Sequence, residues 1–243
     1  FLFQRFSGPL TIYIGLGDSA IADAGMGMLS QLGFTFLNGK SKKLSGSAKT
    51  LSEITTVSGR AKIPTEITLK ILCDVENPVC GDQGSARVFA PQKGASPEQV
   101  EQIARGMENF SKQLEALTRI KISTVPRSGS AGGLGAGLLG GLGAELLPGA
   151  ETALQLVNFQ ERLNRADFVV TGEGKTDAQT LKGKAPLECI RQASQAKKRS
   201  YLISGVLERQ GIFKIPGLQG MFATGKTPDA EAALVRTVRE VFG

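Results

Sequence analysis

The residues best suited to chemistry lie in one short segment, residues 167–184, where an apolar run gives way to glycine and charge. Its carboxylates Glu173 and Asp177 can accept a proton or bind a metal ion. Lys175 stands between them and adds a positive charge that suits an anionic ligand. The segment therefore predicts a ligand site in which both charge signs act within a few residues.

A strand and a helix are expected to position this segment. Residues 168–171 are rich in β-forming side chains without helical periodicity, so we expect a buried strand that ends at the last of them. In the loop that follows, Gly172 and Gly174 allow positive φ and close approach of a ligand to the backbone. A helix is expected over residues 186–198, because proline favours the first helical position. The loop would then lie at a strand's carboxyl end, where open α/β sheets bind ligands.

The segment does not contain a complete P-loop. Residues 174–176 resemble the end of that motif, but the motif needs a glycine at the position that Val169 occupies. The pair at residues 183–184 fails in the same way, with Ala178 at the glycine position. A surface turn between a strand and a helix is the alternative interpretation, and it would need no particular carboxylates.

The same segment resembles a family signature. T-G-E-G-K-T-D-A-Q-T-L-K-G-K-A-P, residues 171–186, is similar to the T-G-E-G-R-x-D-x-Q-T-x-x-G-K-x-P of bacterial type I glycerate kinases. Two further stretches agree in the family's order, C-D-V-E-N-P-V-C-G-D-Q-G-S-A-R-V-F-A-P-Q-K-G-A at residues 73–95 and G-S-A-G-G-L-G-A-G-L-L at residues 129–139. The resemblance covers nearly the whole chain. It implies ATP-dependent phosphorylation of D-glycerate, with 2-phosphoglycerate as the favoured product and Mg²⁺ carried by the nucleotide.

The resemblance also suggests roles for individual residues. Asp177 would accept the proton of the glycerate hydroxyl or orient that hydroxyl, and Lys175 or Lys184 would offset phosphate charge. Glu173 and Asp177 are the metal candidates, and Glu173 and Asp74 could contact the metal or a substrate hydroxyl. The expected substrate contacts are Ser19, Asp23, Asp74, Asn77, Gln92, Lys93, Gly172, Glu173, Gly174, Gln179 and Thr180.

The beginning of the chain agrees with the family only in part. Residues 17–27 are similar to G-G-S-A-T-N-D-G-G-x-G, and Ser19 and Asp23 occupy matching positions. The stretch departs at Asp18, where a carboxylate replaces glycine, and at the apolar residues 21–22. These departures would weaken an anion-binding loop through charge repulsion and lost hydrogen bonds.

A strand predicted over residues 67–73 leads into Asp74. At a strand's carboxyl end, this carboxylate could reach a metal, a hydroxyl or an anion. The alternative is that Asp74 caps a turn or the next helix, as Asp often does after a strand. Gln92 and Lys93 precede a helix that a Ser-Pro start predicts to run to about residue 118. Both side chains could meet an anionic ligand or simply be exposed.

Glycine and alanine dominate residues 129–143. From Gly133 onward glycine recurs every four residues, which on a helix makes a flat face for close packing. Residues 128–133 could in addition offer backbone N–H groups at a helix N-terminus to a phosphate or carboxylate. A further helix is expected over residues 150–163.

Composition excludes several kinds of function. The 243 residues are 41% hydrophobic, with a net charge of +7 and no histidine. Without histidine there is no Ser-His-Asp triad, and three irregularly spaced cysteines make neither a disulfide framework nor a zinc site. The basic residues are dispersed and no apolar run has membrane length, so we expect no nucleic-acid or membrane partner and a cytoplasmic protein. A homodimer is left open.

These elements predict an α/β protein with two α/β domains. Residues 1–163 would form a mixed α/β domain with glycine-rich ligand loops. Residues 164–243 would form the C-terminal part of a Rossmann-like domain, a parallel sheet with flanking helices, because strands and helices alternate there.

Three functions follow from these features. Phosphoryl transfer suits glycine-rich strand ends with carboxylates and lysines. Family members begin with a strand and a loop close to D-S-F-K, which residues 1–10 do not match. The alternative is therefore a catalytically incomplete member or fragment that binds a small acid or a nucleotide. A third interpretation, a dinucleotide-dependent oxidoreductase, depends on Gly15 and Gly17 alone.

Overall fold

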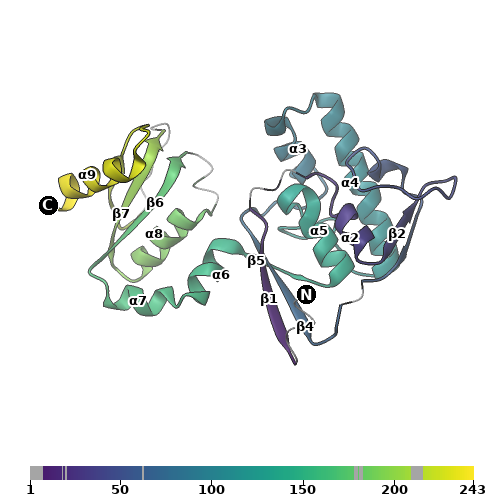
Figure 1. The fold of residues 1–243 in the computed structure, drawn as a ribbon, viewed down its shortest axis with the longest axis horizontal. Helices are drawn as coiled ribbons and strands as arrows, with labels where there is room; N and C mark the ends of the chain where they lie inside the picture. Colours follow the sequence, from purple (N-terminus) through teal and green to yellow (C-terminus); the bar gives the residue numbers. More distant parts are fainter. Residues whose placement is uncertain are drawn as a thin grey trace. The chain divides into compact units, whose positions relative to one another are not determined.

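The computed structural model describes residues 8–17, 19, 21–61, 63–177, 180, 183–208 and 216–243. The chain divides into two compact units, unit 1 (Phe1–Gly149) and unit 2 (Ala150–Gly243). Each unit has a parallel sheet with helices packed on it (Figure 1), which confirms the α/β class. The domain division after residue 163 stays a prediction, and that position lies within unit 2.

The main sheet of unit 1 has three parallel strands in the order β1 (Leu10–Gly15), β4 (Ile67–Cys73) and β5 (Glu145–Pro148). β4 confirms the strand predicted over residues 67–73. The sequence analysis did not predict β5, because four residues are too few to show a strand periodicity. Since the strands are parallel, their carboxyl ends lie along one edge of the sheet, where Asp74 follows β4.

Helix α5 (Ser130–Leu142) packs on this sheet. The core beneath it consists of Leu69, Ile71, Cys73, Leu138 and Ala144. Side chains at Gly137 and Gly141 would meet the Ala24 carbonyl and the Leu29 side chain, which confirms close packing along the glycine face. The first turn of α5 departs from helical geometry, because residues 131–133 all have positive φ.

A second core of unit 1 lies beside an antiparallel pair of strands. The elements around it are α2 (Met26–Gln31), α3 (Ser85–Phe89), α4 (Pro97–Thr118), β2 (Phe34–Leu37) and β3 (Thr56–Gly59). Phe36 and Phe110 stack at its centre with ring centroids 5.9 Å apart. β2 pairs with β3 in an antiparallel register, and η1 (Leu51–Glu53) is a short helix between them.

The start of α4 confirms the predicted serine cap. The Ser96 hydroxyl accepts the Gln99 N–H at 3.3 Å, and the Gln99 side chain accepts the Ser96 N–H at 2.8 Å. This reciprocal pair satisfies two donors that a helix start otherwise leaves unpaired. The short helix η2 (Pro91–Lys93) precedes the cap and carries two of the predicted ligand residues.

Near its other end, α4 holds the chain that follows it through Glu115. The Oε1 atom of Glu115 accepts the N–H groups of Ile122 and Ser123, both at 2.8 Å. Burial raises the pKa of Glu115, but these hydrogen bonds outweigh burial and hold the pKa below its ordinary value of 4.5. The carboxylate therefore stabilises the fold in its charged form.

We expect Glu115→Gln to lower the free energy of unfolding by about 1 kcal/mol near neutral pH, because charge-assisted hydrogen bonds are stronger than neutral ones. A lowered folded-state pKa gives stability that is present above the unfolded-state pKa and is lost as the pH falls through the folded-state pKa. The advantage of the wild type should therefore vanish in acid. Urea unfolding at neutral and at strongly acid pH measures this, with the exposed Glu66→Gln as control. A difference that persists in acid would contradict the assignment.

Unit 2 is built around a second parallel sheet with the strand order β6-β7-β8. Its elements are α6 (Gly149–Leu156), α7 (Phe159–Arg165), β6 (Phe168–Thr176), α8 (Ala185–Gln195), β7 (Arg199–Leu207), β8 (Leu218–Ala223) and α9 (Ala230–Phe242). This alternation of strands and helices confirms the expected pattern. The single helix expected over residues 150–163 is instead two helices, because Asn158 has a φ of 52° and interrupts it.

Helices α8 and α9 cover opposite faces of the unit 2 sheet (Figure 1). On one face, Thr171 of β6 contacts Cys189 of α8. On the other, the ring of Phe242 in α9 packs against Phe168 and Tyr201 at centroid distances of 5.4 and 5.0 Å. Successive strand residues alternate between faces, so Thr171 and Phe168 point in opposite directions.

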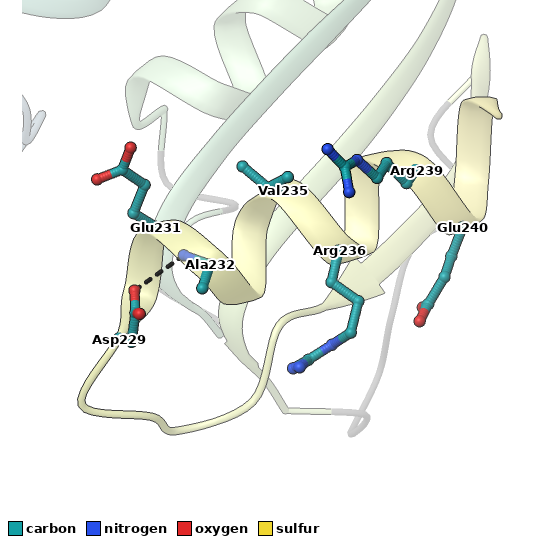
Figure 2. Close-up of a pocket in the computed structure, with 7 residues that line it drawn as sticks. All are labelled: Asp229, Glu231, Ala232, Val235, Arg236, Arg239 and Glu240. Carbon is teal, nitrogen blue, oxygen red and sulfur yellow. Dashed lines mark hydrogen bonds between the residues drawn. The ribbon is translucent and has the colours of Figure 1, made fainter.

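The outer side of α9 presents a hollow of about 620 Å³ (Figure 2). It is lined by Asp229, Glu231, Ala232, Val235, Arg236, Arg239 and Glu240. All of these belong to one helix and its N-cap, where Asp229 accepts the Ala232 N–H at 2.9 Å. The hollow is therefore an open helix face without converging walls. Within the described residues, no helix is both long and apolar enough to cross a membrane.

Candidate active site

Strand β6 continues further than the sequence analysis predicts. Residues 172–176 belong to the strand and run alongside β7, so the expectation that the strand ends at Thr171 and a loop follows is wrong. The reason is that β7 offers a partner along this whole stretch. Gly172 allows β6 and β7 to lie this close together, because a side chain at this position would overlap the carbonyl oxygen of Ile203.

Glu173 joins the strand to the turn that follows it. Its Oε1 atom accepts the hydroxyl groups of Thr176 at 2.9 Å and Thr180 at 2.6 Å. Thr176 and Thr180 are 0% and 2% exposed, and Thr176 also shares a hydrogen bond with the buried hydroxyl of Ser204. Glu173 therefore orients this turn. A metal contact through its other oxygen stays a prediction.

Asp177 follows β6 directly, at the carboxyl end of a parallel strand. Its Oδ2 atom lies 3.4 Å from Nζ of Lys175, which lies 2.6 Å from Oε1 of Glu208. The hydrogen bond with Glu208, and after it the one with Asp177, raise the pKa of Lys175, so this side chain stays a cation. The Asp177 side chain is 19% exposed and the Lys175 side chain is 50% exposed. A half-exposed cation and a more buried carboxylate therefore stand together at this strand end.

Three further predicted residues of unit 2 stand near this pair in the sequence. Lys184 is the N-cap residue of α8, where the positive end of the helix dipole favours anions. Gly174 has open space where a side chain would stand. Gln179 lies outside the described residues. Unit 2 thus gathers most of its predicted site residues at the end of β6.

The remaining predicted residues belong to unit 1, where a cleft of about 350 Å³, the unit 1 cleft, opens at the carboxyl edge of the sheet. Its walls are Leu16, Gly17 and Ser19 after β1, Asp74 and Val75 after β4, Phe89, Gln92 and Lys93 before α4, and Ser130, Ala131 and Gly132 of α5. Four predicted ligand residues therefore meet here: Ser19, Asp74, Gln92 and Lys93. Lys93 Nζ donates to the Ser19 carbonyl oxygen at 3.2 Å, which holds the cation at the cleft.

Asp74 presents an exposed carboxylate to the unit 1 cleft. Its Oδ1 atom lies 2.7 Å from the place that a Cβ would occupy at Gly149, so the missing side chain makes room for it. Within the described part of the chain, this carboxylate makes no hydrogen bond, and the alternative role as a cap is not realised there. Asp74 can therefore accept a hydrogen bond from a ligand.

Two predicted residues of unit 1 have other partners. The Asp23 carboxylate accepts the N–H groups of Gly25 at 3.0 Å and Gly27 at 2.8 Å, at the start of α2. The Asn77 side chain donates to the carbonyl oxygen of Gln83 at 2.8 Å. Neither residue lines the unit 1 cleft, so a substrate contact of either stays a prediction.

The first turn of α5 was not among the candidate site residues. Residues 128–133 had only a general anion-binding role in the sequence analysis. The signal was a serine followed by small residues. The sequence could not show that this turn is left-handed, with a φ of 54° even at Ala131. The turn forms part of one wall of the unit 1 cleft.

Among the described residues, no three His, Cys, Asp or Glu side chains come together as a metal site. Mg²⁺ in nucleotide-dependent enzymes is commonly held by one or two carboxylates together with substrate phosphates. The oxygen donors Glu173 and Asp177 fit that chemistry.

Residues 6–241 match the model of the glycerate kinase family. The chain belongs to the glycerate kinase family. This match confirms the resemblance in the three motifs. The matched range includes Glu173, Lys175 and Asp177 of unit 2.

Named relatives agree with this assignment. The chain is 36% identical over 202 residues to a glycerate kinase of Halalkalibacterium halodurans, covering 82% of this chain and 53% of that protein. It is 33% identical over 221 residues to glycerate 2-kinase of Escherichia coli, covering 89% of this chain and 58% of that protein. The chain thus spans about half the length of the curated relatives it matches.

A solved structure supports the fold. A crystal structure from Salmonella typhimurium LT2, provisionally assigned as glycerate kinase 2, matches with a TM-score of 0.74 and 30% sequence identity. The match covers 95% of this chain and 61% of that chain. Both units therefore have counterparts in a member of the glycerate kinase family.

Proposed function

We propose that the protein is a glycerate kinase, which transfers the γ-phosphoryl group of ATP to a hydroxyl of D-glycerate, with 2-phosphoglycerate as the favoured product. Family membership supports the reaction class. The observation that carries the proposal is the pair of Lys175 and Asp177 at the end of β6, held by the contacts of Glu173 and Glu208. Such a pair can orient a hydroxyl and attract a phosphate.

In this proposal the residues of the two units have distinct roles. Asp177 accepts the proton of the glycerate hydroxyl as its oxygen attacks the γ-phosphorus, and ADP leaves with the electrons of the broken P–O bond. Lys175 and Lys184 offset the phosphate charge, in keeping with the raised pKa of Lys175. In unit 1, the charges of Lys93 and Asp74 suit a ligand that carries an acid group and a hydroxyl group.

ATP is the co-substrate in this proposal, and Mg²⁺ neutralises its phosphate charge when bound. Asp177 is the first candidate to hold the ion and Glu173 the second, because Oε1 of Glu173 already accepts two hydroxyl groups. A homodimer and a cytoplasmic location remain predictions.

The decisive experiment is a coupled assay of ADP release with the 243-residue chain, ATP, Mg²⁺ and D-glycerate, beside calorimetric titration of each ligand. Turnover that requires D-glycerate is the expected result, and ³¹P NMR of the product identifies the phosphorylated carbon. Binding of ATP and glycerate without turnover would favour the alternative, a catalytically incomplete binding module. The absence of both binding and turnover would exclude both functions for this chain.

A glycine pair tests where ligands approach β6. A Cβ at Gly174 would have no atom within 4 Å, whereas one at Gly172 would overlap the Ile203 carbonyl oxygen. We expect Gly174→Ala to preserve the free energy of unfolding but to lower kcat/KM by about tenfold or more, because a methyl group would obstruct a ligand at the backbone. The matched Gly172→Ala should instead cost about 1–3 kcal/mol of stability. An unchanged kcat/KM in Gly174→Ala would remove Gly174 from the site.

A further inference from the structure

Two buried side-chain polar atoms in the described part of unit 1 make no hydrogen bond of standard geometry, Nε of Arg127 and Oγ of Ser130. Arg127 precedes α5, and Ser130 is its first residue. A buried hydroxyl without a strong partner is unfavourable, because it has lost its hydrogen bonds to water. Native proteins rarely keep such a group unless a ligand, an ion or water completes it.

Ser130 is the more informative of the two atoms. It is 2% exposed and yet lines the unit 1 cleft. The thiol of Cys73 is a neighbour of the Ser130 hydroxyl: burial raises the pKa of that thiol, and a hydrogen bond from Ser130 lowers it in part. Sulfur is a weak acceptor, and no oxygen or nitrogen atom of the described residues pairs with the hydroxyl. Ser130 therefore stands in the cleft wall without a strong acceptor in the described protein.

A neighbouring serine shows what this turn does with a structural hydroxyl. Ser128 is fully buried, donates to the Val125 carbonyl oxygen at 2.7 Å and accepts the Val79 N–H at 2.9 Å. The backbone N–H of Ser130 also donates to the Arg127 carbonyl oxygen at 3.0 Å. The backbone around Ser130 is thus held in place while its hydroxyl has only the weak contact with the Cys73 thiol.

We propose that Ser130 donates its hydroxyl hydrogen to the carboxylate of the acid bound in the unit 1 cleft. The inference rests on the proposed function, since it assumes a small hydroxy acid as substrate. A carboxylate is the ligand chemistry that suits this wall, because Lys93 supplies a positive charge to the same cleft. Lys93 uses one donor on the Ser19 carbonyl, which leaves others for the ligand.

Asp74 gives the bound acid an orientation. Its exposed carboxylate repels the carboxylate of the ligand and accepts a hydrogen bond from a hydroxyl. The cleft therefore discriminates between the two ends of a hydroxy acid. Ser130 and Lys93 bind the acid end, and Asp74 contacts the hydroxyl end.

The test compares Ser130→Ala with Ser128→Ala by calorimetric titration and urea unfolding. The probes are D-glycerate, glycolate and glycerol, and glycerol keeps the hydroxyls of glycerate without the carboxylate. We expect Ser130→Ala to weaken D-glycerate binding by about 10–100-fold, the typical effect of one hydrogen bond to a charged group. Glycerol binding and the urea midpoint should not fall. Ser128→Ala should show the opposite, a lower midpoint because the Val79 N–H loses its acceptor, with little change in affinity.

Each outcome bears on a different claim. Equal D-glycerate affinity in the wild type and Ser130→Ala would overturn the role of Ser130 and leave the glycerate assignment standing. A different result is that the wild type binds glycolate but not D-glycerate, and that Ser130→Ala weakens glycolate binding. This result would uphold the carboxylate site and overturn the glycerate assignment. Equal losses for glycerol and glycerate would also overturn the role of Ser130. Binding of no acid at all would overturn both claims.

Discussion

Replacing Asp177 with asparagine is expected to lower turnover of D-glycerate by about 10²–10⁴-fold, the range typical of a lost proton acceptor. Asparagine keeps the shape of the side chain but cannot take the hydroxyl proton. The fold should survive, because Glu173 holds the adjoining turn through Thr180. Coupled ADP release measures turnover, and circular dichroism with a urea titration measures the fold.

The control for this substitution is Glu208→Gln. Glu208 is the nearer ion-pair partner of Lys175, at 2.6 Å against 3.4 Å for Asp177. Its loss should leave most of the turnover, since exposed ion pairs contribute little. If Glu208→Gln and Asp177→Asn reduced turnover equally, Asp177 would act only by positioning Lys175. Retained turnover in Asp177→Asn would remove Asp177 from the mechanism.

The second large effect is expected at Gly132, in the wall of the unit 1 cleft. Its φ is +64°, and a Cβ there would overlap the carbonyl oxygen of Ile21. The Gly132 carbonyl oxygen also accepts the Ala24 N–H at 3.2 Å, so the two segments are tied together. Gly132→Ala should lower the free energy of unfolding by roughly 2–5 kcal/mol, the sum of left-handed strain and overpacking.

Gly143 provides a matched control at the other end of α5. Its φ is +65°, almost that of Gly132, but no atom lies within 4 Å of a Cβ there. Gly143→Ala should cost only the backbone strain, about 1–2 kcal/mol. Urea unfolding of both variants separates strain from close packing. Equal losses of unfolding free energy in the two variants would show that the overlap with Ile21 is relieved by a small movement and does not destabilise the protein.

Local signals predicted several elements well. The strand at residues 67–73 and the capped start of α4 appear where the sequence places them. Both depend on neighbouring residues, an apolar alternation in one case and Ser96 with Gln99 in the other. The short strand β5 and the strand β3 were missed, because four residues hold too little periodicity and their partners lie far away in the chain.

The candidate site shows the same division. The sequence identified Lys175 and Asp177 as candidates, because their charges stand beside glycines after an apolar run. It predicted a loop where β6 continues, since a sequence does not show that β7 lies alongside as far as Leu207. It also could not predict that Asp23 would be occupied by backbone N–H groups at the start of α2.

By itself, the sequence determined the family, the alternation of strands and helices in unit 2 and the chemistry available without histidine, because motifs, periodicity and composition are local properties. The tertiary structure alone decided which side chains meet. Lys93 reaches the Ser19 carbonyl, and Ser128 supports Val79, while Ser130 has no oxygen or nitrogen partner among the described residues. These pairings join distant parts of the chain, and they depend on packing that no single stretch of sequence contains.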